Sequence, residues 1–358
     1  IVVIGGMCLS GAVYAGTVSL PQTGQTTMLS AGDDGALQKG VIWPNPRFTS
    51  NSDQTVADNL TGLVWSKDGS TPTVGSCTGG KKSWQAALDY VKCLNGANYL
   101  GHNDWRLPNI NELESLTNAG QDKLSLWLNT QGFSSVQADF YWSSTTFAED
   151  TTKAWDINMF DGPKGAHVNT SNYYVWPVRT GQAGVAAIWA TGQLISYAAG
   201  DDGDLKKGVA WPNPRFTNNG DGTVTDNLTG LAWAQKAEPN ETSCINANIY
   251  YRWQAALDYV KCINTLNHLG YSDWRLPNKK ELLSLVDHGR YSVAIPTGHP
   301  FIGSWIHSFF SSTTYANNNA NNWYVWMGNG GTDDYVKDGG NLMTWPVRDG
   351  TASVPTPT

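Results

Sequence analysis

The sequence is poor in charge and has no strongly basic region. Charged residues make up 15% of its 358 positions, and 30 Asp and Glu outnumber 23 Lys and Arg, which gives a formal net charge of −7. Nucleic acids are bound largely through Lys and Arg that replace the counterions of the phosphates. Because the chain has no run of such residues, we expect no nucleic-acid partner.

Long apolar segments are also missing after the first residues. No later stretch approaches the roughly 18 apolar residues of a membrane-spanning helix, so we expect no transmembrane span. Residues 1–15 are mostly small and apolar and end in Val13-Tyr14-Ala15, which has the small residues of a signal-peptidase site. We interpret residues 1–15 as a truncated signal peptide and expect an exported protein, located in the periplasm, on the cell surface or outside the cell.

Cysteine is scarce, and its spacing is informative. Apart from Cys8 in the signal region, the chain has Cys77 and Cys93 in its first half and Cys244 and Cys262 in its second half. In an exported chain each of these four residues has one nearby partner, so we predict the disulfides Cys77–Cys93 and Cys244–Cys262. Each disulfide would stabilise the fold by about 3 kcal/mol through loop closure.

Histidine is rare as well, and its positions do not indicate a zinc site. No pair has the spacing of a helical zinc site, and none occupies the same place in both of the repeats described below. The histidines therefore indicate no zinc cofactor, and calcium, discussed below, is the only cofactor for which the sequence offers candidate ligands. The six residues are His102, His167, His268, His288, His299 and His307.

Glycine, tryptophan and tyrosine are abundant, with 38, 17 and 15 residues, and they recur in a long internal repeat. Residues 103–113 return as residues 272–282, and residues 23–65 align with residues 191–233 without a gap. Self-similarity on this scale predicts two domains of one kind.

The repeat also predicts the domain boundaries. A Gly/Ala-rich linker would tether two independent domains, whose contacts with one repeating ligand would reinforce each other. Sequence divergence at 118–139 and 287–307 indicates surface loops inside a shared frame. We expect a first copy at 16–180, a linker at 181–190, a second copy at 191–349 and a loose tail at 350–358.

Two helices are predicted in each copy. The apolar residues of 84–91 recur at i, i+3, i+4 and i+7, which is typical of a helix with one buried face. Further on, Pro108 excludes the preceding residue from a helix, Asn109 can cap a helix, and Glu112 lies where a capping box needs it. The second copy repeats both patterns.

Five ordered motifs, each present twice, resemble the Lcl C-terminal domain family, named after the terminal domain of a bacterial collagen-like adhesin. In the first copy these motifs begin with Asp58-Asn59-Leu60-Thr61-Gly62, continue through the helix at Trp84 and Asp104-Trp105-Arg106-Leu107-Pro108-Asn109, and end with Ser143-Ser144-Thr145-Thr146 and Trp176-Pro177-Val178-Arg179. At the level of the fold they are also similar to C-type-lectin-like domains and sulfatase-modifying enzymes. The resemblance implies an α+β fold with two tandem C-type-lectin-like domains, each a twisted antiparallel sheet with two helices and long loops.

The ligand of the named adhesin cannot be assigned to this chain from the resemblance alone. The named adhesin is associated with sulfated glycosaminoglycans, but this acidic chain has scattered bases, with Lys279-Lys280 as one local pair. Sulfated glycans are therefore not the preferred ligand. Sulfatase-modifying enzymes need reactive Cys late in the chain, and none follows Cys262.

Three Trp residues and two Arg residues are candidates for ligand binding. Trp127, Trp305 and Trp326 occur in one copy each, in or near the divergent loops, whereas the shared Trp positions are more typical of a core. Arg106 and Arg275 have the chemistry to bind a ligand carboxylate, but a structural pair with Glu112 or Glu281 is the favoured interpretation.

The acidic loops of the two copies are candidates for calcium binding. Carboxylates flanked by Gly supply the oxygen ligands that calcium prefers, although their spacing is not that of an EF-hand loop. A turn in which the Asp side chains cap backbone N–H groups is the alternative. The residues are Asp33, Asp34, Asp201, Asp202 and Asp204.

These features predict a surface or secreted binding protein, similar to an adhesin or lectin, with carbohydrate as its ligand. The alternative is a structural or protein-binding module of a cell-surface assembly that has no sugar affinity. We expect no enzyme, because the copies share no catalytic set and Ser143 and Ser311 lack the glycines of a nucleophile elbow.

Overall fold

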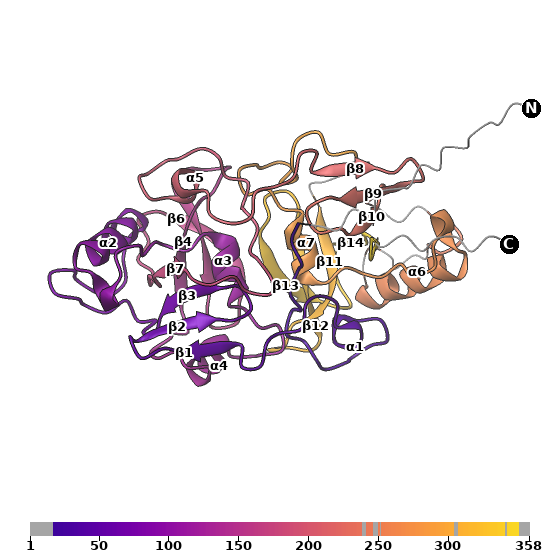
Figure 1. The fold of residues 1–358 in the computed structure, drawn as a ribbon. Helices are drawn as coiled ribbons and strands as arrows, with labels where there is room; N and C mark the ends of the chain where they lie inside the picture. The colour runs from indigo at the N-terminus through magenta and orange to yellow at the C-terminus, as the bar shows by residue number, and fades with distance from the viewer. Residues whose placement is uncertain are drawn as a thin grey trace, which may run out of the picture.

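The structure is a computed structural model, and it describes residues 17–237, 241–245, 250, 252–303, 307–340 and 342–350. The predicted signal peptide and all but the first residue of the predicted tail lie outside this part. Figure 1 shows two similar cores side by side, the first mainly purple and the second mainly orange and yellow. The α+β class and the two tandem copies are confirmed, whereas the likeness to C-type lectins stays a prediction.

The first half of the chain contains four α-helices, a 3₁₀ helix and seven strands in the part that is described. The helices are α1 (Asp34–Leu37), α2 (Trp84–Gly96), η1 (Tyr99–Gly101), α3 (Ile110–Ser115) and α4 (Leu124–Thr130). The strands are β1 (Phe48–Ser50), β2 (Thr55–Asp58), β3 (Leu63–Ser66), β4 (Phe140–Thr146), β5 (Lys153–Asn158), β6 (Lys164–Val168) and β7 (Val178–Thr180).

The second half repeats this order with two differences: its described residues have no counterpart of α4, and they add a short strand, β14, that the first half lacks. Its helices are α5 (Asp202–Leu205), α6 (Trp253–Thr265), η2 (His268–Gly270) and α7 (Lys279–Ser284). Its strands are β8 (Phe216–Asn218), β9 (Thr223–Asp226), β10 (Ala232–Ala234), β11 (Ser308–Thr314), β12 (Asn321–Trp326), β13 (Thr332–Val336), β14 (Leu342–Met343) and β15 (Val347–Arg348).

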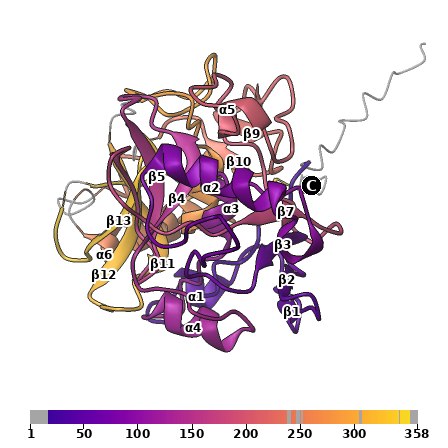
Figure 2. The ribbon, with the colours of Figure 1, turned by 90° about the vertical axis from the view of Figure 1, so that its left-hand side faces the viewer.

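Each copy has a small four-stranded antiparallel sheet of its own. The strand orders are β1-β2-β3-β7 and β15-β10-β9-β8, so the last strand of each copy closes the sheet that its first strands begin. Figure 2 shows the first of these small sheets to one side of β4 and β5. Trp65 and Trp233, at the centres of these sheets, are fully buried.

The predicted capped helices are confirmed in both copies. The side chain of Asn109 accepts from the backbone N–H of Glu112, and the carboxylate of Glu112 accepts in return from the backbone N–H of Asn109. Asn278 and Glu281 form the same capping box at the start of α7. Each box satisfies two backbone donors that a helix N-terminus would otherwise leave unpaired.

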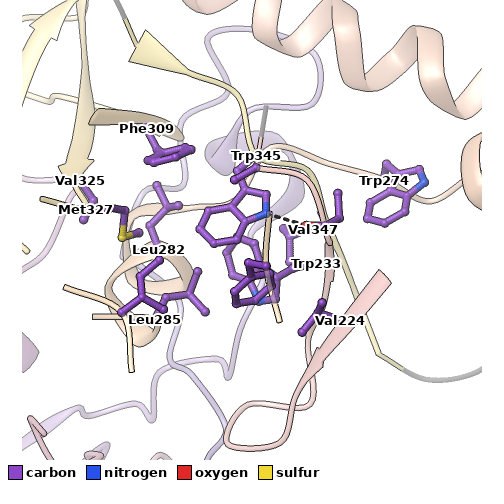
Figure 3. Close-up of a cluster of buried hydrophobic side chains, with 14 of the residues drawn as sticks. Val224, Trp233, Trp274, Leu282, Leu285, Phe309, Val325, Met327, Trp345 and Val347 are labelled. Atoms are coloured by element: carbon purple, nitrogen blue, oxygen red, sulfur yellow. Dashed lines mark hydrogen bonds between the residues drawn. The ribbon is translucent and has the colours of Figure 1, made fainter. Parts of the chain in front are cut away.

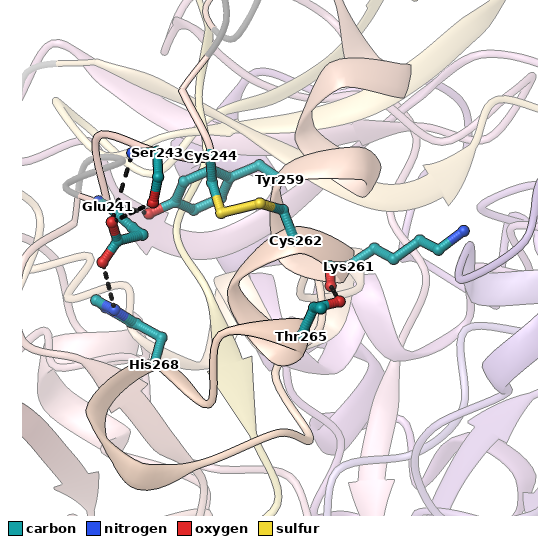
Figure 4. The surroundings of a disulfide bond; sticks show 8 residues. All are labelled: Glu241, Ser243, Cys244, Tyr259, Lys261, Cys262, Thr265 and His268. Carbon is teal, nitrogen blue, oxygen red and sulfur yellow. Dashed lines mark hydrogen bonds and ion pairs between the residues drawn. A yellow bond between two sulfur atoms is a disulfide. The ribbon is translucent and has the colours of Figure 1, made fainter.

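Both predicted disulfides are present. Cys77 is bonded to Cys93, and Cys244 is bonded to Cys262, with 5.7 Å between the Cα atoms in each pair. Figure 4 shows how the second disulfide ties the segment before α6 to the buried side of that helix, beside Tyr259. Each bond thus fixes a loop to the amphipathic helix of its own copy.

Tryptophan fills the cores, as the shared Trp positions indicate. In the second copy Trp345 stands between Trp233, 5.0 Å away between ring centroids, and Phe309, 5.4 Å away (Figure 3). Its indole N–H donates to the carbonyl of Ala234 at 2.9 Å. Burying a large ring whose one polar atom is hydrogen-bonded stabilises the core without an unpaired donor.

The two copies share one sheet of seven strands in the order β14-β11-β12-β13-β6-β5-β4. The copies meet where β13 pairs with β6 in antiparallel register, with Thr332 opposite Lys164. Since these residues occupy the same position in the two copies, the pair lies on an approximate twofold axis. The expectation of one sheet per copy is therefore incomplete: the described chain has three sheets, and the largest spans both copies.

The segment that leads into each copy packs on the other copy. We call residues 17–43 the first arm and residues 185–211 the second arm. In Figure 1 the indigo α1 lies beside the second core, while the salmon α5 lies over the first core. Val18 of the first arm donates its N–H to the carbonyl of Leu228, and Ala186 of the second arm donates to that of Leu60, both at 2.8 Å. The exchange is reciprocal.

A buried Asp fixes each arm to the core of the other copy. Asp34 accepts from the hydroxyl of Thr313 at 2.7 Å, and Asp202 accepts from that of Thr145 at 2.7 Å. Gly35 lets α1 pack closely on the loop of its own arm, because a Cβ there would lie 2.0 Å from the carbonyl oxygen of Thr27. Burial raises the pKa of Asp34 to about 6 and that of Asp202 to about 7.

The expectation of a free tether between the copies is not met. Gly181 donates its backbone N–H to Gly62, and Ala186, Ile188 and Trp189 are buried. Residues 181–190 therefore run along the first core and continue directly into the exchanged arm.

Cutting the chain between the exposed residues Gln182 and Ala183 should not separate its halves. A specific protease site placed there would be cleaved after folding, and the products examined by gel filtration without denaturant. We expect one particle of the intact mass, because the arms and the β6–β13 pair hold the halves together. Two independent monomers would contradict the exchange. The same cut in an Asp34→Ala, Asp202→Ala variant should release the halves more readily.

The two buried Asp residues should also impose a pH dependence. Their folded pKa values, about 6 and about 7, exceed the ordinary value of 3.8, so the folded state holds these protons more tightly than the unfolded state. Their contribution to stability is full below pH 3.8 and is lost as pH rises from there through the folded values of about 6 and about 7. In denaturant titrations across this range, the fall in unfolding free energy should be smaller for Asp34→Asn, Asp202→Asn than for the wild type. An equal fall in the variant and the wild type would show that Asp34 and Asp202 do not cause the pH dependence.

Candidate functional site

A groove with a volume of about 360 Å³ lies on the shared sheet where the two copies meet. Both copies contribute to its walls, so neither copy forms it alone. It is lined by the loop after β4, by β5 and β6, and by β12, β13 and the turn between them. The lining residues are Phe147, Glu149, Trp155, Gly165, Ala166, Tyr324, Trp326, Asn329, Gly331, Thr332 and Asp333.

Alternate residues of β12 point into the groove and give it an aromatic wall. Trp323 and Val325 are buried, whereas Tyr324 is half-buried and Trp326 is 40% exposed, so the latter two project from the opposite face. Gly328 leaves room for the ring of Trp326, because a Cβ there would lie 2.6 Å from the indole nitrogen. The strand thus presents two adjacent aromatic side chains to the groove.

Trp155 forms the floor of the groove. It is 1% exposed, and its ring meets Phe147 edge-on at 5.2 Å between centroids. Small residues lie above it: a Cβ at Gly331 would come within 4.0 Å of the ring, and Gly165 and Ala166 add little bulk. The groove is therefore an apolar hollow whose shape depends on missing side chains.

Polar groups lie at the edges of this hollow. Glu149 and Asp333 are exposed, and Asn329 is half-buried. The carboxylate of Asp333 accepts from the backbone N–H of Asp334 at 2.9 Å, and Asn329 accepts from that of Gly331 at 2.8 Å. Both side chains keep oxygen or nitrogen atoms for a ligand, since each of these bonds uses a single acceptor atom.

The twofold-related position in the other copy is closed. There the hydroxyl of Tyr315 donates to Asp161 at 2.6 Å, and Lys279 lies 3.8 Å from the centroid of Trp323. A small pocket of about 10 Å³ lies beside Tyr315, Asp161 and Trp323. At the corresponding positions the open groove has Phe147, Asn329 and Ile110, which make neither the hydroxyl bond nor the cation contact. Of the two equivalent positions, one is therefore an open groove and the other is filled by side chains.

Buried charges join the copies beneath this region. Lys279 forms an ion pair with Glu114 of the first copy at 3.2 Å, and the ammonium group of Lys280 lies 3.4 Å from the carbonyl oxygen of Glu114. Burial lowers the pKa of Lys164 to about 7 and that of Lys280 to about 8. Burial alone would raise the pKa of Glu114, but the neighbouring lysines hold it below its usual value.

A family model describes both halves of the chain. The Lcl C-terminal domain model matches residues 54–179 and again residues 222–348, which together are more than half of the sequence. The chain belongs to the Lcl C-terminal domain family. The family indicates an adhesin-type domain of bacterial surfaces. A search of curated proteins found no significant match.

The Trp candidates have different positions in this tandem Lcl C-terminal structure. Trp326 lines the groove, as a ligand-binding residue would. Trp127 is half-buried in α4 and packs against Trp43 and Phe48, each with 6.0 Å between centroids. Trp305 lies outside the described residues. The structure thus brings one of the three to the groove and gives another a packing role.

The Arg candidates have structural partners. Arg106 makes two hydrogen bonds to the carboxylate of Glu112, and Arg275 makes two to that of Glu281, at 2.6 and 2.8 Å. Arg275 also binds Asp349 at 2.8 Å. Both Arg residues are buried and lie outside the groove, so the structural interpretation is confirmed for these pairs.

The Asp residues proposed as calcium ligands form local hydrogen bonds. Asp33 and Asp201 each cap the short helix of their arm, and Asp34 and Asp202 hold Thr hydroxyls. Asp204 accepts from a backbone N–H of its own loop. Within the described ranges, no group of three or more His, Cys, Asp or Glu is placed to hold a metal ion. These loops fit the turn interpretation.

A larger groove of about 820 Å³ lies between the first arm and α6. Three of its charged residues pair with one another, Lys39 and Arg275 with Asp349, and Asp258 accepts from the side-chain amide of Gln254. Trp274, which lines it, is only 2% exposed. This groove therefore offers no open aromatic face.

Sequence reasoning missed most of the groove because its walls come from both Lcl C-terminal domains. Asp333 was not singled out, although Asp333-Asp334 replaces Gly165-Ala166 in a strand that otherwise aligns. Acidic residues that appear in one copy of a shared strand are a signal that a closer comparison of the copies would have found. The β6–β13 pairing has no such signal.

Replacing Glu114 should destabilise the protein strongly. Glu114→Gln removes the anionic partner of the buried Lys279, and breaking a buried pair in this way costs about 3 kcal/mol or more. Denaturant unfolding would measure the loss, with Glu149→Gln as an exposed control expected to change stability by about 0.5 kcal/mol or less. A loss below about 1 kcal/mol would contradict the role of this pair.

Replacing both partners should restore part of the lost stability, while Lys164 and Lys280, which also face Glu114, stay in place. Glu114→Leu with Lys279→Ile installs the residues found at the matching positions of the other copy, Leu283 and Ile110. An apolar pair of this kind is often as stable as the buried ion pair that it replaces.

Proposed function

We propose that this protein is an exported, non-enzymatic binding protein of the bacterial surface and that the groove between its copies binds carbohydrate. Family membership supports the surface role, and the two disulfides support an oxidising compartment. No helix in the described ranges is long and apolar enough to cross a membrane.

The open aromatic wall beside polar groups is the observation that carries the proposal. A sugar ring has an apolar C–H face and a rim of hydroxyls, so it fits a site with an aromatic surface and a few oriented polar groups. Trp326 and Tyr324 offer the surface, and Asn329, Asp333 and Glu149 offer hydrogen-bonding partners. The neighbouring Trp155 closes the bottom of the groove.

A role without catalysis is proposed for two reasons. The hydroxyls of Ser143 and Ser311 are buried and donate to the carbonyls of Trp155 and Trp323, each at 2.7 Å, so these serines have strand-stabilising roles. Metal-assisted hydrolysis would need a ligand set, and the described residues contain none of three or more groups. Incubation with oligosaccharides followed by product analysis tests this part, since any cleavage would contradict it.

A second candidate function is a protein-binding module of a surface assembly. It is favoured by apolar side chains exposed on the arms: Leu194 is 72% exposed, Ile195 is 65% exposed, and Met28 is 63% exposed. Exposed apolar residues of this size are typical of contact sites. Binding to immobilised glycans that free sugar competes away would favour the carbohydrate function, whereas protein capture insensitive to sugar would favour the module.

The groove predicts a direct effect of Trp326→Ala on binding. Removing the exposed ring should weaken glycan affinity about tenfold or more, because a central aromatic anchor carries a large share of binding energy. Isothermal titration or glycan-array binding would measure the change. Tyr291→Ala, which removes a 51% exposed ring elsewhere, should leave affinity and stability unchanged. Equal affinity of Trp326→Ala and the wild type would exclude the groove as the site.

The closed counterpart supplies a second variant. Phe147→Tyr places a hydroxyl where Tyr315 has one in the filled position, and it faces Asn329 in place of Asp161. We expect the groove to narrow and glycan affinity to fall while the unfolding free energy stays within about 0.5 kcal/mol of the wild type. Leu126→Ala, on an exposed part of α4, is the control. Unchanged affinity with Phe147→Tyr would show that the ligand does not reach this wall.

A further inference from the structure

We propose that the groove selects saccharides that carry a protonated amine over neutral, sulfated or carboxylated saccharides. This inference rests on the proposed carbohydrate function and names the ligand class of the same site. It starts from the charges of the lining residues, which, in the part of the chain that the structure describes, include two carboxylates, Glu149 and Asp333, and no Lys, Arg or His.

The charge is concentrated at Asp333. Partial desolvation raises the pKa of this carboxyl, and the nearby Asp334 and Asp161 raise it further, so the site is one of negative potential. Lys279 opposes the shift, but its ammonium group is paired with Glu114 and lies against Trp323. A cation from a ligand would relieve this repulsion, whereas a sulfate or carboxylate would add to it.

Two basic groups lie beneath the floor of the groove, and a third, His167 beside Gly165, is paired with Asp156 at 2.7 Å. The ammonium nitrogen of Lys164 is 5.5 Å from the centroid of Trp155, and its side chain is buried. Burial lowers the pKa of Lys164 to about 7, and burial keeps the pKa of His288 well below its ordinary value, so His288 is neutral. Neither group presents a full positive charge to a ligand above the floor.

The geometry places aromatic and acidic groups on the same face. Tyr324 lies directly opposite Asp333 in the pairing of β12 with β13, so both side chains project from one side of the sheet. Trp326 follows two residues later on that face and lines the same groove. An ammonium group is attracted both to carboxylates and to aromatic faces, so this arrangement suits an amino sugar that stacks on the wall.

The negative charge of Asp333 is not a feature that the two copies share. Where β13 has Asp333 and Asp334, β6 has Gly165 and Ala166 at the twofold-related positions. Asp333 therefore belongs to the open groove and is not part of what both copies need to fold.

Short oligosaccharides of matched length provide the test. The intact protein would be titrated with a β-1,4-linked glucosamine oligomer, with the same oligomer fully N-acetylated, and with an N-sulfated form. We expect the amine form to bind most tightly and the sulfated form least. Raising the pH above the pKa of the sugar amine should abolish the preference, because the ligand then loses its charge.

Two variants, each of which removes one negative charge, test whether the preference for the amine form depends on Asp333. Asp333→Asn should weaken binding of the amine form about fivefold, the scale of a solvent-accessible ion pair, and leave the N-acetylated form unchanged. Asp338→Asn removes an exposed carboxylate outside the groove and should change neither affinity. If both variants weaken the amine form equally, the attraction is a general effect of the acidic chain and the inference is wrong.

The outcomes distinguish this inference from the carbohydrate function. Equal affinity for the amine and N-acetylated forms, with both lost in Trp326→Ala, would overturn the charge selectivity and keep the groove as a sugar site. Tighter binding of the N-sulfated form would also overturn it. No binding of any form by the wild-type protein would reject both proposals.

Discussion

The pairing of β6 with β13 is the contact on which the rest of the molecule depends. Two equivalent strands meet there, with Lys164 opposite Thr332, and their hydrogen bonds turn two sheet edges into one seven-stranded sheet. An exposed strand edge invites pairing with other chains, so this contact also protects both copies from unwanted association. The exchanged arms reinforce it, because each arm can dock only when the other core lies beside it.

Duplication within one chain allowed the two sides of this axis to diverge. A symmetric dimer must carry the same residue on both sides, whereas this chain has Phe147 on one side and Tyr315 on the other. The same freedom placed Lys279 opposite Glu114, a buried pair that identical subunits would have to form twice. One side of the axis is consequently filled by Tyr315, Lys279 and Asp161, and the other stays open as the groove.

The predictable features depend on local patterns. The capping boxes, the amphipathic helices and both disulfides follow from short spacings, because each involves residues that are close in sequence or forced together by elimination. The exchange of arms was not predictable in this way. Thr145 and Thr313 occur in identical motifs, so Asp34 has an equivalent partner in either copy, and only the three-dimensional path of the chain decides between them. Trp326 was predicted because it is unshared, and a closer comparison of the two copies would also have indicated Asp333.

The asymmetry changes what two copies contribute to binding. Independent domains on a flexible tether would gain apparent affinity by engaging a repeating ligand twice. Here residues 181–190 are docked on the first core, and Tyr315, Lys279 and Asp161 occupy the position equivalent to the groove. The second copy contributes instead to the walls of a single site, through β12 and β13. The duplication thus provides shape and charge at one groove rather than a higher number of sites.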